Sequence, residues 1–274
     1  MNAEIKQKLT RNSLHIIGML SPKLAGQIAG HIFTTPSRVP APSREEIYLE
    51  GARKITLKSG YRGFVWGKDG TLGSILLVHG WSGRAGQMGM FGQILSKHGY
   101  TVYAFDGPGH GISPGHTTDP RRFANFIINT ANEVGDIVGV IAHSFGAGAS
   151  AFAVSMGLNI DKLVYMAGPY YYKTILDEFA TFMQLDARVN AAFYAKMENL
   201  VGIPMDQMVV GKFLQGSHVQ GLIIHDEQDD IVPITAAKLL HQDWVNSEIY
   251  ITNGLGHRKI LHDNTVAAKV LEFF

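Results

Sequence analysis

Two patterns of hydrophobic residues alternate along most of this chain. Almost continuous apolar runs of five to eight residues, such as SILLVHG at 74–80, are typical of strands buried on both faces of a sheet. Segments with apolar residues three or four positions apart, such as 87–99 and 119–135, are typical of helices. Repeated strand–helix units with short links build a mostly parallel sheet. We therefore predict an α/β fold, with a mostly parallel twisted sheet and helices on both faces.

Two segments depart from this alternation. Residues 45–51 and 53–68 alternate around glycine turns, which predicts antiparallel strands at the start of the sheet. Residues 169–217 separate two predicted strands by far more than one crossover helix needs, and they show no strand alternation. We expect this second segment to form an inserted helical cap.

The N-terminal segment carries Lys6, Lys8 and Arg11 ahead of the apolar run LHIIGML at 14–20. This arrangement resembles the start of a signal peptide. The run ends at Ser21 after seven residues, however, and is far short of the ~20 residues that span a bilayer. We predict two short helices that pack on the domain, with peripheral contact to a membrane surface as the alternative.

Three prolines within residues 34–45 indicate a linker after these helices. The predicted organisation is an N-terminal helical extension with linker over 1–45, a core over 46–168 and 218–274, and the cap over 169–217.

The composition narrows the classes of function. Of the 274 residues 46% are hydrophobic and 17% charged, as in a globular domain with a large core. The formal net charge is +1 and no long basic run occurs, which argues against nucleic acid as a partner. The chain has no cysteine, so disulfides and thiolate chemistry are excluded, and a cytoplasmic location is expected. Metal-binding, dinucleotide-binding and Walker motifs are absent from the sequence, so we predict neither a metal nor a cofactor.

The stretch VGVIAHSFGAG at 138–148 places Ser144 between a predicted strand and a predicted helix. Such a tight turn strains the backbone of its central residue and presents that side chain at the edge of the sheet. The positions two residues on either side must be small, and they are Ala142 and Gly146. The amide of Phe145 then points towards any oxyanion formed at Ser144. The alternative is a plain turn whose serine caps the helix.

A serine hydroxyl is a poor nucleophile without a base and an orienting acid. Asp229 and Asp230 follow the predicted strand at 219–226, and His257 follows the one at 247–253. All three lie just past the carboxyl ends of strands, where open parallel sheets place their sites. They are therefore candidates for the acid and the base that act on Ser144.

Five motifs together resemble the α/β-hydrolase superfamily over roughly residues 70–274. They are similar, in order, to its oxyanion loop, its Asp-x-Pro-Gly-x-Gly-x-Ser loop, its nucleophile elbow, its acid-bearing loop and the Gly-His that carries the base. The motifs in this chain are LLVHGW at 76–81, FDGPGHGIS at 105–113, AHSFG at 142–146, HDEQDDIVP at 225–233 and GLGH at 254–257. Two departures are Ala142 and Asp226, each in place of a family glycine.

The resemblance implies individual roles. Asp229 lies four residues before Pro233, as the family's acid does, and leaves Asp230 as a solvated carboxylate or helix cap. Trp81 follows His-Gly and would supply the second oxyanion amide beside that of Phe145.

Four side chains are candidates for the substrate pocket, namely Trp81, His143, Tyr170 and Tyr171. Large aromatic residues at these positions fit a buried core equally well. Arg84, after the oxyanion loop, is expected to be either an anion clamp or a surface charge.

The function implied by the resemblance is that of a serine hydrolase, with a Ser144–His257–Asp229 triad cleaving a small carboxylic ester through an acyl-enzyme. Thioesterase, lipase-like and carbon–carbon bond hydrolase activities use the same machinery and stay open, as does acyl transfer to an alcohol. A non-catalytic binding module of the same fold is disfavoured, because such proteins usually lack a triad residue and all three positions are filled here.

Overall fold

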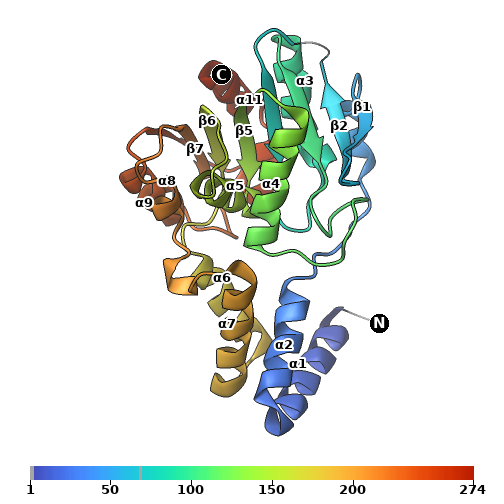
Figure 1. Cartoon of the computed structure of the whole chain (residues 1–274), viewed down its shortest axis with the longest axis vertical. Helices are drawn as coiled ribbons and strands as arrows, with labels where there is room; N and C mark the ends of the chain where they lie inside the picture. The colour runs from blue at the N-terminus through green and yellow to red at the C-terminus, as the bar shows by residue number, and fades with distance from the viewer. Residues whose placement is uncertain (1–2, 68–69) are drawn as a thin grey trace. The chain divides into compact units, whose positions relative to one another are not determined.

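The computed structural model describes residues 3–67 and 70–274 (Figure 1). These residues fall into two compact units. The first, called the helical unit here, combines the described part of residues 1–35 with residues 171–209. The second, the sheet unit, comprises residues 36–170 and 210–274.

The sheet unit contains one sheet of eight described strands in the order β1-β2-β4-β3-β5-β6-β7-β8. The β1–β2 and β2–β4 pairs are antiparallel, and every other neighbouring pair is parallel. This confirms the predicted mostly parallel sheet with antiparallel strands at its start. The strands are β1 (Arg53–Thr56), β2 (Arg62–Trp66), β3 (Ser74–Val78), β4 (Thr101–Phe105), β5 (Ile137–His143), β6 (Lys162–Met166), β7 (Gln220–Asp226) and β8 (Ser247–Thr252).

Helices connect the strands and cover both faces of the sheet, as predicted. The α-helices of the sheet unit are α3 (Gly89–Lys97), α4 (Pro120–Val134), α5 (Phe145–Ser155), α8 (Val210–Leu214), α9 (Thr235–Asp243), α10 (Gly256–Lys259) and α11 (Asn264–Phe273). Its 3-10 helices are η1 (Ser43–Tyr48), η2 (Ala85–Met88) and η4 (Ile260–His262). The strand predicted over 45–51 is wrong, because this segment forms η1 and a turn whose Tyr48 and Leu49 pack against the core. Figure 1 shows α4 and α5 in front of the sheet. On one face, alternate strand residues such as Ile75 and Leu77 pack with Phe91 of α3 and Val266 of α11.

The helical unit combines the two ends of its sequence. Its α-helices are α1 (Ala3–Leu20), α2 (Pro22–Phe33), α6 (Tyr172–Met183) and α7 (Ala187–Val201), followed by the 3-10 helix η3 (Met205–Gln207). Helix α2 packs along α7. A Cβ atom at Gly26 would lie 2.5 Å from the Cβ of Ala192, so only glycine allows this close approach.

A cluster of aromatic rings joins α2 to the inserted helices α6 and α7. The ring of Phe33 lies 5.0 Å from that of Phe179 and 5.6 Å from that of Phe193, measured between centroids. The N-terminal helices therefore pack on the helices inserted between β6 and β7. Within the described chain, no helix combines the length and apolarity that crossing a bilayer requires.

Candidate active site

Ser144 occupies the turn between β5 and α5 in a backbone conformation that L-residues rarely adopt. Its φ is +55° and its ψ is −125°. The turn is tight, because a Cβ atom at Gly146 would lie 2.3 Å from the carbonyl oxygen of His79. Ala142, in place of the usual glycine, is fully buried at the end of β5. The small residues around Ser144 thus let the chain turn sharply and present the hydroxyl at the carboxyl end of the strand.

His257 lies within hydrogen-bonding distance of both Ser144 and Asp229. His257 Nε2 is 2.9 Å from Ser144 Oγ, and His257 Nδ1 is 2.8 Å from Asp229 Oδ2. Since a carboxylate only accepts, Nδ1 carries the ring proton and Nε2 accepts from the serine. The three side chains come from three separate strand ends, as predicted.

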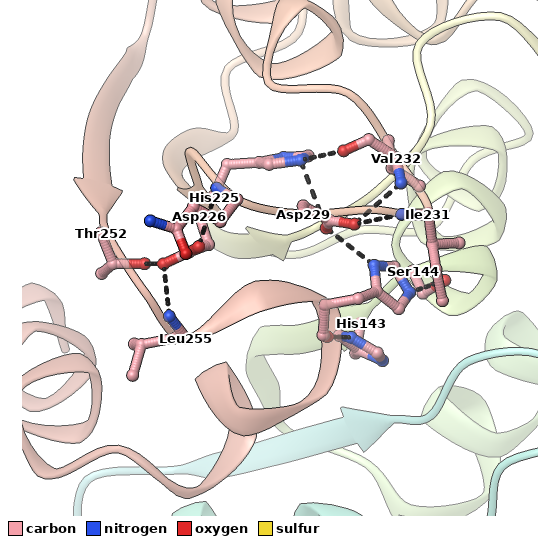
Figure 2. A network of polar contacts seen from close by, with 11 residues as sticks. His143, Ser144, His225, Asp226, Asp229, Ile231, Val232, Thr252 and Leu255 are labelled. Atoms are coloured by element: carbon pink, nitrogen blue, oxygen red, sulfur yellow. Dashed lines mark hydrogen bonds and ion pairs between the residues drawn. The ribbon is translucent and has the colours of Figure 1, made fainter.

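Asp229 is held as a charged carboxylate. Burial raises its pKa, but hydrogen bonds from His257 and from the amides of Val232 and Ile231 outweigh that effect and bring the pKa below its usual range. The two amides donate to Oδ1 at 2.8 and 2.9 Å, which leaves Oδ2 for His257 (Figure 2). The acid therefore keeps both its charge and its orientation.

His225, a buried residue of β7 that is not among the site residues predicted from sequence, contacts the same carboxylate. Its Nε2 donates to the carbonyl of Val232 at 2.8 Å and lies 3.4 Å from Asp229 Oδ2 (Figure 2). Burial lowers the pKa of His225, so the ring is neutral. The available signal was a titratable residue inside an apolar strand, which is costly unless it is hydrogen-bonded.

Asp226, which replaces the glycine of the family's acid-bearing loop, ties two loops together. It accepts hydrogen bonds from Thr252 Oγ1 at 2.7 Å and from the amide of Leu255 at 3.0 Å (Figure 2). Burial raises its pKa, but these bonds and those from other backbone amides outweigh burial and lower the pKa to about 2. Asp226 therefore anchors the start of the loop that carries His257.

Comparison with known proteins agrees with the fold of the sheet unit. A sequence model of the alpha/beta hydrolase family matches residues 75–214, which is half of the chain. The chain belongs to the alpha/beta hydrolase family. A serine hydrolase-like protein of Dictyostelium discoideum is 28% identical to this hydrolase over 105 residues, covering 36% of this chain. The match spans 29% of that relative's own length.

Solved structures share the fold of this hydrolase at low sequence identity. An esterase of Pyrococcus furiosus is 19% identical with a TM-score of 0.63, over 87% of this chain and 97% of its own. The 2-hydroxy-6-oxo-6-phenylhexa-2,4-dienoate hydrolase of Rhodococcus sp. strain RHA1 is 15% identical with a TM-score of 0.60, over 81% of this chain and 98% of its own.

His143 supports His257 from the end of β5. Its Nε2 donates to the carbonyl oxygen of His257 at 2.8 Å, and the two ring centroids are 4.8 Å apart. Burial, together with the neighbouring His257, lowers the pKa of His143 to about 3. His143 is therefore a neutral donor that fixes the backbone of the hydrolase's candidate base.

Two further buried histidines order the loop that carries Trp81. His79 accepts from the amide of Gly107 at 2.9 Å, and His110 accepts from the amide of Ser82 at 3.0 Å. Burial lowers the pKa of His79 to about 4 and that of His110 to about 3, so both rings are neutral. The hydrogen bonds join the loop after β3 to the loop after β4.

The four candidate pocket residues differ in their surroundings. The side chain of Trp81 is 37% exposed, and its ring packs edge-on against that of Phe145 at 5.1 Å. Tyr170 is buried and donates its hydroxyl to Asp243, whereas Tyr171 is exposed in the helical unit. The assignment of these residues and of His143 to a substrate pocket stays a prediction.

Arg84 is neither the anion clamp nor the surface charge that the sequence analysis offered. Its guanidinium forms two hydrogen bonds with the buried carboxylate of Glu45, from Nε at 2.8 Å and from Nη2 at 2.5 Å. The partner lies 39 residues away in η1, so the sequence alone could not show this buried ion pair. Among the residues that the structure describes, no group of three or more His, Asp or Glu side chains is placed to hold a metal ion.

Proposed function

We propose that this hydrolase cleaves a small carboxylic ester through an acyl-enzyme formed on Ser144. The observation that carries the proposal is the chain of two hydrogen bonds, 2.9 Å from Ser144 Oγ to His257 Nε2 and 2.8 Å from His257 Nδ1 to Asp229 Oδ2. A base within reach of the hydroxyl and an acid that orients the base are what a serine nucleophile needs.

In the first half of the reaction, His257 Nε2 takes the proton from Ser144 Oγ while that oxygen attacks the ester carbonyl. The imidazolium that forms is stabilised by the carboxylate of Asp229, whose lowered pKa keeps it charged. His257 then gives the proton to the departing alcohol oxygen as the carbon–oxygen bond breaks. The acyl group remains on Ser144 as an ester.

In the second half, water replaces the alcohol. His257 takes a proton from the water as its oxygen attacks the acyl carbonyl, and returns that proton to Ser144 Oγ as the acid leaves. The amides of Phe145 and Trp81 would bind the negatively charged oxygen of both tetrahedral intermediates. Each such donor is worth about 3 kcal/mol of transition-state stabilisation. Phe145 suits this role because it is the first residue of α5, where no side chain caps the helix.

The ester is preferred as substrate because an esterase is among the similar structures. The dienoate hydrolase among them makes carbon–carbon bond cleavage the second candidate, since the same nucleophile and base serve both reactions. Hydrolysis of thioesters, hydrolysis of lipids and acyl transfer to an alcohol are alternatives that the same assay tests.

The test is a series of p-nitrophenyl esters from acetate to dodecanoate, with a matched thioester and a dienoate carbon–carbon substrate. We expect the wild-type chain to hydrolyse a short ester, and Ser144→Ala to lose at least about 10³-fold in kcat. Absence of turnover on all substrates, or ester turnover that persists in Ser144→Ala, would overturn the proposal. Added alcohol distinguishes a transferase, which would yield mainly the new ester.

A further inference from the structure

Helix α1 carries large apolar side chains on one exposed face. Together with the exposed Leu24 at the start of α2, we name these residues the docking face. Each member keeps between 49% and 86% of its side-chain surface exposed. The docking face consists of Ile5, Leu9, Ile16, Met19, Leu20 and Leu24.

The spacing of these residues places them along one side of α1. At 100° per residue, Ile5, Leu9, Ile16, Met19 and Leu20 fall within an arc of roughly 100°. The opposite side carries Leu14 and Gly18, which are buried. The buried side of such a helix stabilises the fold. A second apolar side that is exposed to solvent adds no stability.

The docking face has a positively charged border. Lys8 is exposed on α1 beside the apolar arc, and Lys23 is exposed between Leu20 and Leu24. Residues 1–35 contain four Lys or Arg and one Glu, a formal charge of +3, while the rest of the chain sums to −2. The excess positive charge is thus concentrated in the segment that carries the exposed apolar side chains.

We propose that the docking face binds a membrane surface rich in anionic lipids, with α1 lying along the interface. Exposed apolar side chains bordered by Lys are the combination that inserts a helix between lipid headgroups and attracts it to them. A second copy of this chain fits less well, because a symmetric pair of docking faces would set one positive border against the other. This proposal is independent of the reaction proposed for Ser144.

The test is co-sedimentation of the full-length chain with vesicles of phosphatidylcholine alone and of phosphatidylcholine with 30% phosphatidylglycerol. We expect binding to the anionic vesicles that weakens with added salt. Ile16→Asp with Met19→Asp should weaken binding at least tenfold, because it places charge where lipid contact is proposed. The matched control is Val245→Asp in the sheet unit, where an isolated apolar side chain is 91% exposed. It should bind like the wild type.

A second variant keeps the test decisive if the first affects folding, which thermal melting monitored by circular dichroism would reveal. Lys8→Glu with Lys23→Glu leaves every apolar residue in place and should also weaken binding to the anionic vesicles. Failure of the wild type to bind anionic vesicles would overturn the proposal, as would unchanged binding of well-folded variants. Sedimentation equilibrium without lipid tests whether a second copy of this chain binds the docking face instead. If the wild type is a dimer and the Ile16→Asp, Met19→Asp double variant is a monomer, the docking face serves self-association, and the membrane proposal is overturned.

Discussion

His225 Nε2 lies 3.4 Å from Asp229 Oδ2, the oxygen that also accepts from His257 Nδ1 at 2.8 Å. Figure 2 shows His225 beside the carboxylate of Asp229. The two histidines play different parts. Burial lowers the pKa of His225, which donates to the carbonyl of Val232 in the loop that carries Asp229, so we expect it to act as a positioning residue rather than as a second base.

His225→Ala should lower kcat by about 10- to 100-fold, because small displacements of a catalytic group have effects of that size. KM for a small ester should change little, since no substrate contact is removed. His225→Gln retains a donor for the carbonyl of Val232 and should recover part of kcat. Steady-state kinetics of the three proteins checks this, and full kcat in His225→Ala would contradict it.

The pH profile separates positioning from proton transfer at His225. Burial lowers its pKa, and a positioning role predicts that it does not set the acid limb of the kcat profile. We expect His225→Gln to scale the profile down without moving that limb. A shift of the acid limb would show that His225 itself titrates during catalysis.

Asp229 and Asp230 form a matched pair for testing the acid. The carboxylate of Asp229 is buried against His257, whereas Asp230 is exposed. Asp229→Asn should lower kcat by about 10³- to 10⁴-fold, because the amide favours the wrong tautomer of His257. Asp230→Asn should stay within about twofold of wild type. Comparable losses in the two variants would contradict the assignment.

The strained backbone at Ser144 predicts a gain in stability when its side chain is removed. With φ at +55° and ψ at −125°, a residue with a Cβ carries about 1 to 3 kcal/mol of strain. Ser144→Gly relieves that strain and Ser144→Ala does not, although both lack the hydroxyl. Urea unfolding should find the glycine variant more stable than the alanine variant by about 1 kcal/mol. An alanine variant as stable as the glycine variant would count against strain at this turn.

Acid should destabilise the sheet unit well before its carboxylates are protonated. The pKa values of His79, His110 and His143 are lowered from 6.5 to about 4, 3 and 3. Between pH 6.5 and 4 these histidines are therefore protonated in the unfolded chain but neutral in the folded chain. The free energy of unfolding consequently falls as the pH falls. Each histidine contributes about 2 kcal/mol to the loss between pH 7 and 5.

The measurement is urea unfolding at pH 7 and pH 5, followed by tryptophan fluorescence. All three tryptophans, Trp66, Trp81 and Trp244, lie in the sheet unit, so the signal reports that unit. His110→Gln cannot take up a proton at this position. Its free energy of unfolding should therefore fall by about 2 kcal/mol less than that of the wild type between pH 7 and pH 5. Equal stability of the wild type at the two pH values would contradict the account.

Much of the sheet unit follows from local sequence. The apolar run at 137–143 and the small residues around Ser144 allow few structures other than a buried strand, a sharp turn and a helix. Acid and base candidates could be placed because the carboxyl ends of parallel strands share one edge. What the sequence could not show are contacts between side chains that lie far apart in it. The Arg84–Glu45 pair and the hydrogen bond from His143 to the carbonyl of His257 depend on loops whose paths no local pattern fixes.

The helical unit shows the same limit. Gly26 and Gly30 in α2 indicate that something approaches closely, but they do not say what does. In the structure it is α7, more than 150 residues further along the chain. Similarly, the aspartate in place of the family glycine at Asp226 is explained by hydrogen bonds from Thr252 and Leu255, which lie more than 25 residues away.

Mass spectrometry of the chain after reaction with a fluorophosphonate tests the central claim most directly, because this reagent phosphonylates an activated serine. We predict a single adduct on the peptide that contains Ser144, absent in Ser144→Ala and strongly slowed in His257→Ala. An adduct on another residue, or labelling of Ser144→Ala at the wild-type rate, would contradict the claim that His257 activates Ser144 for attack.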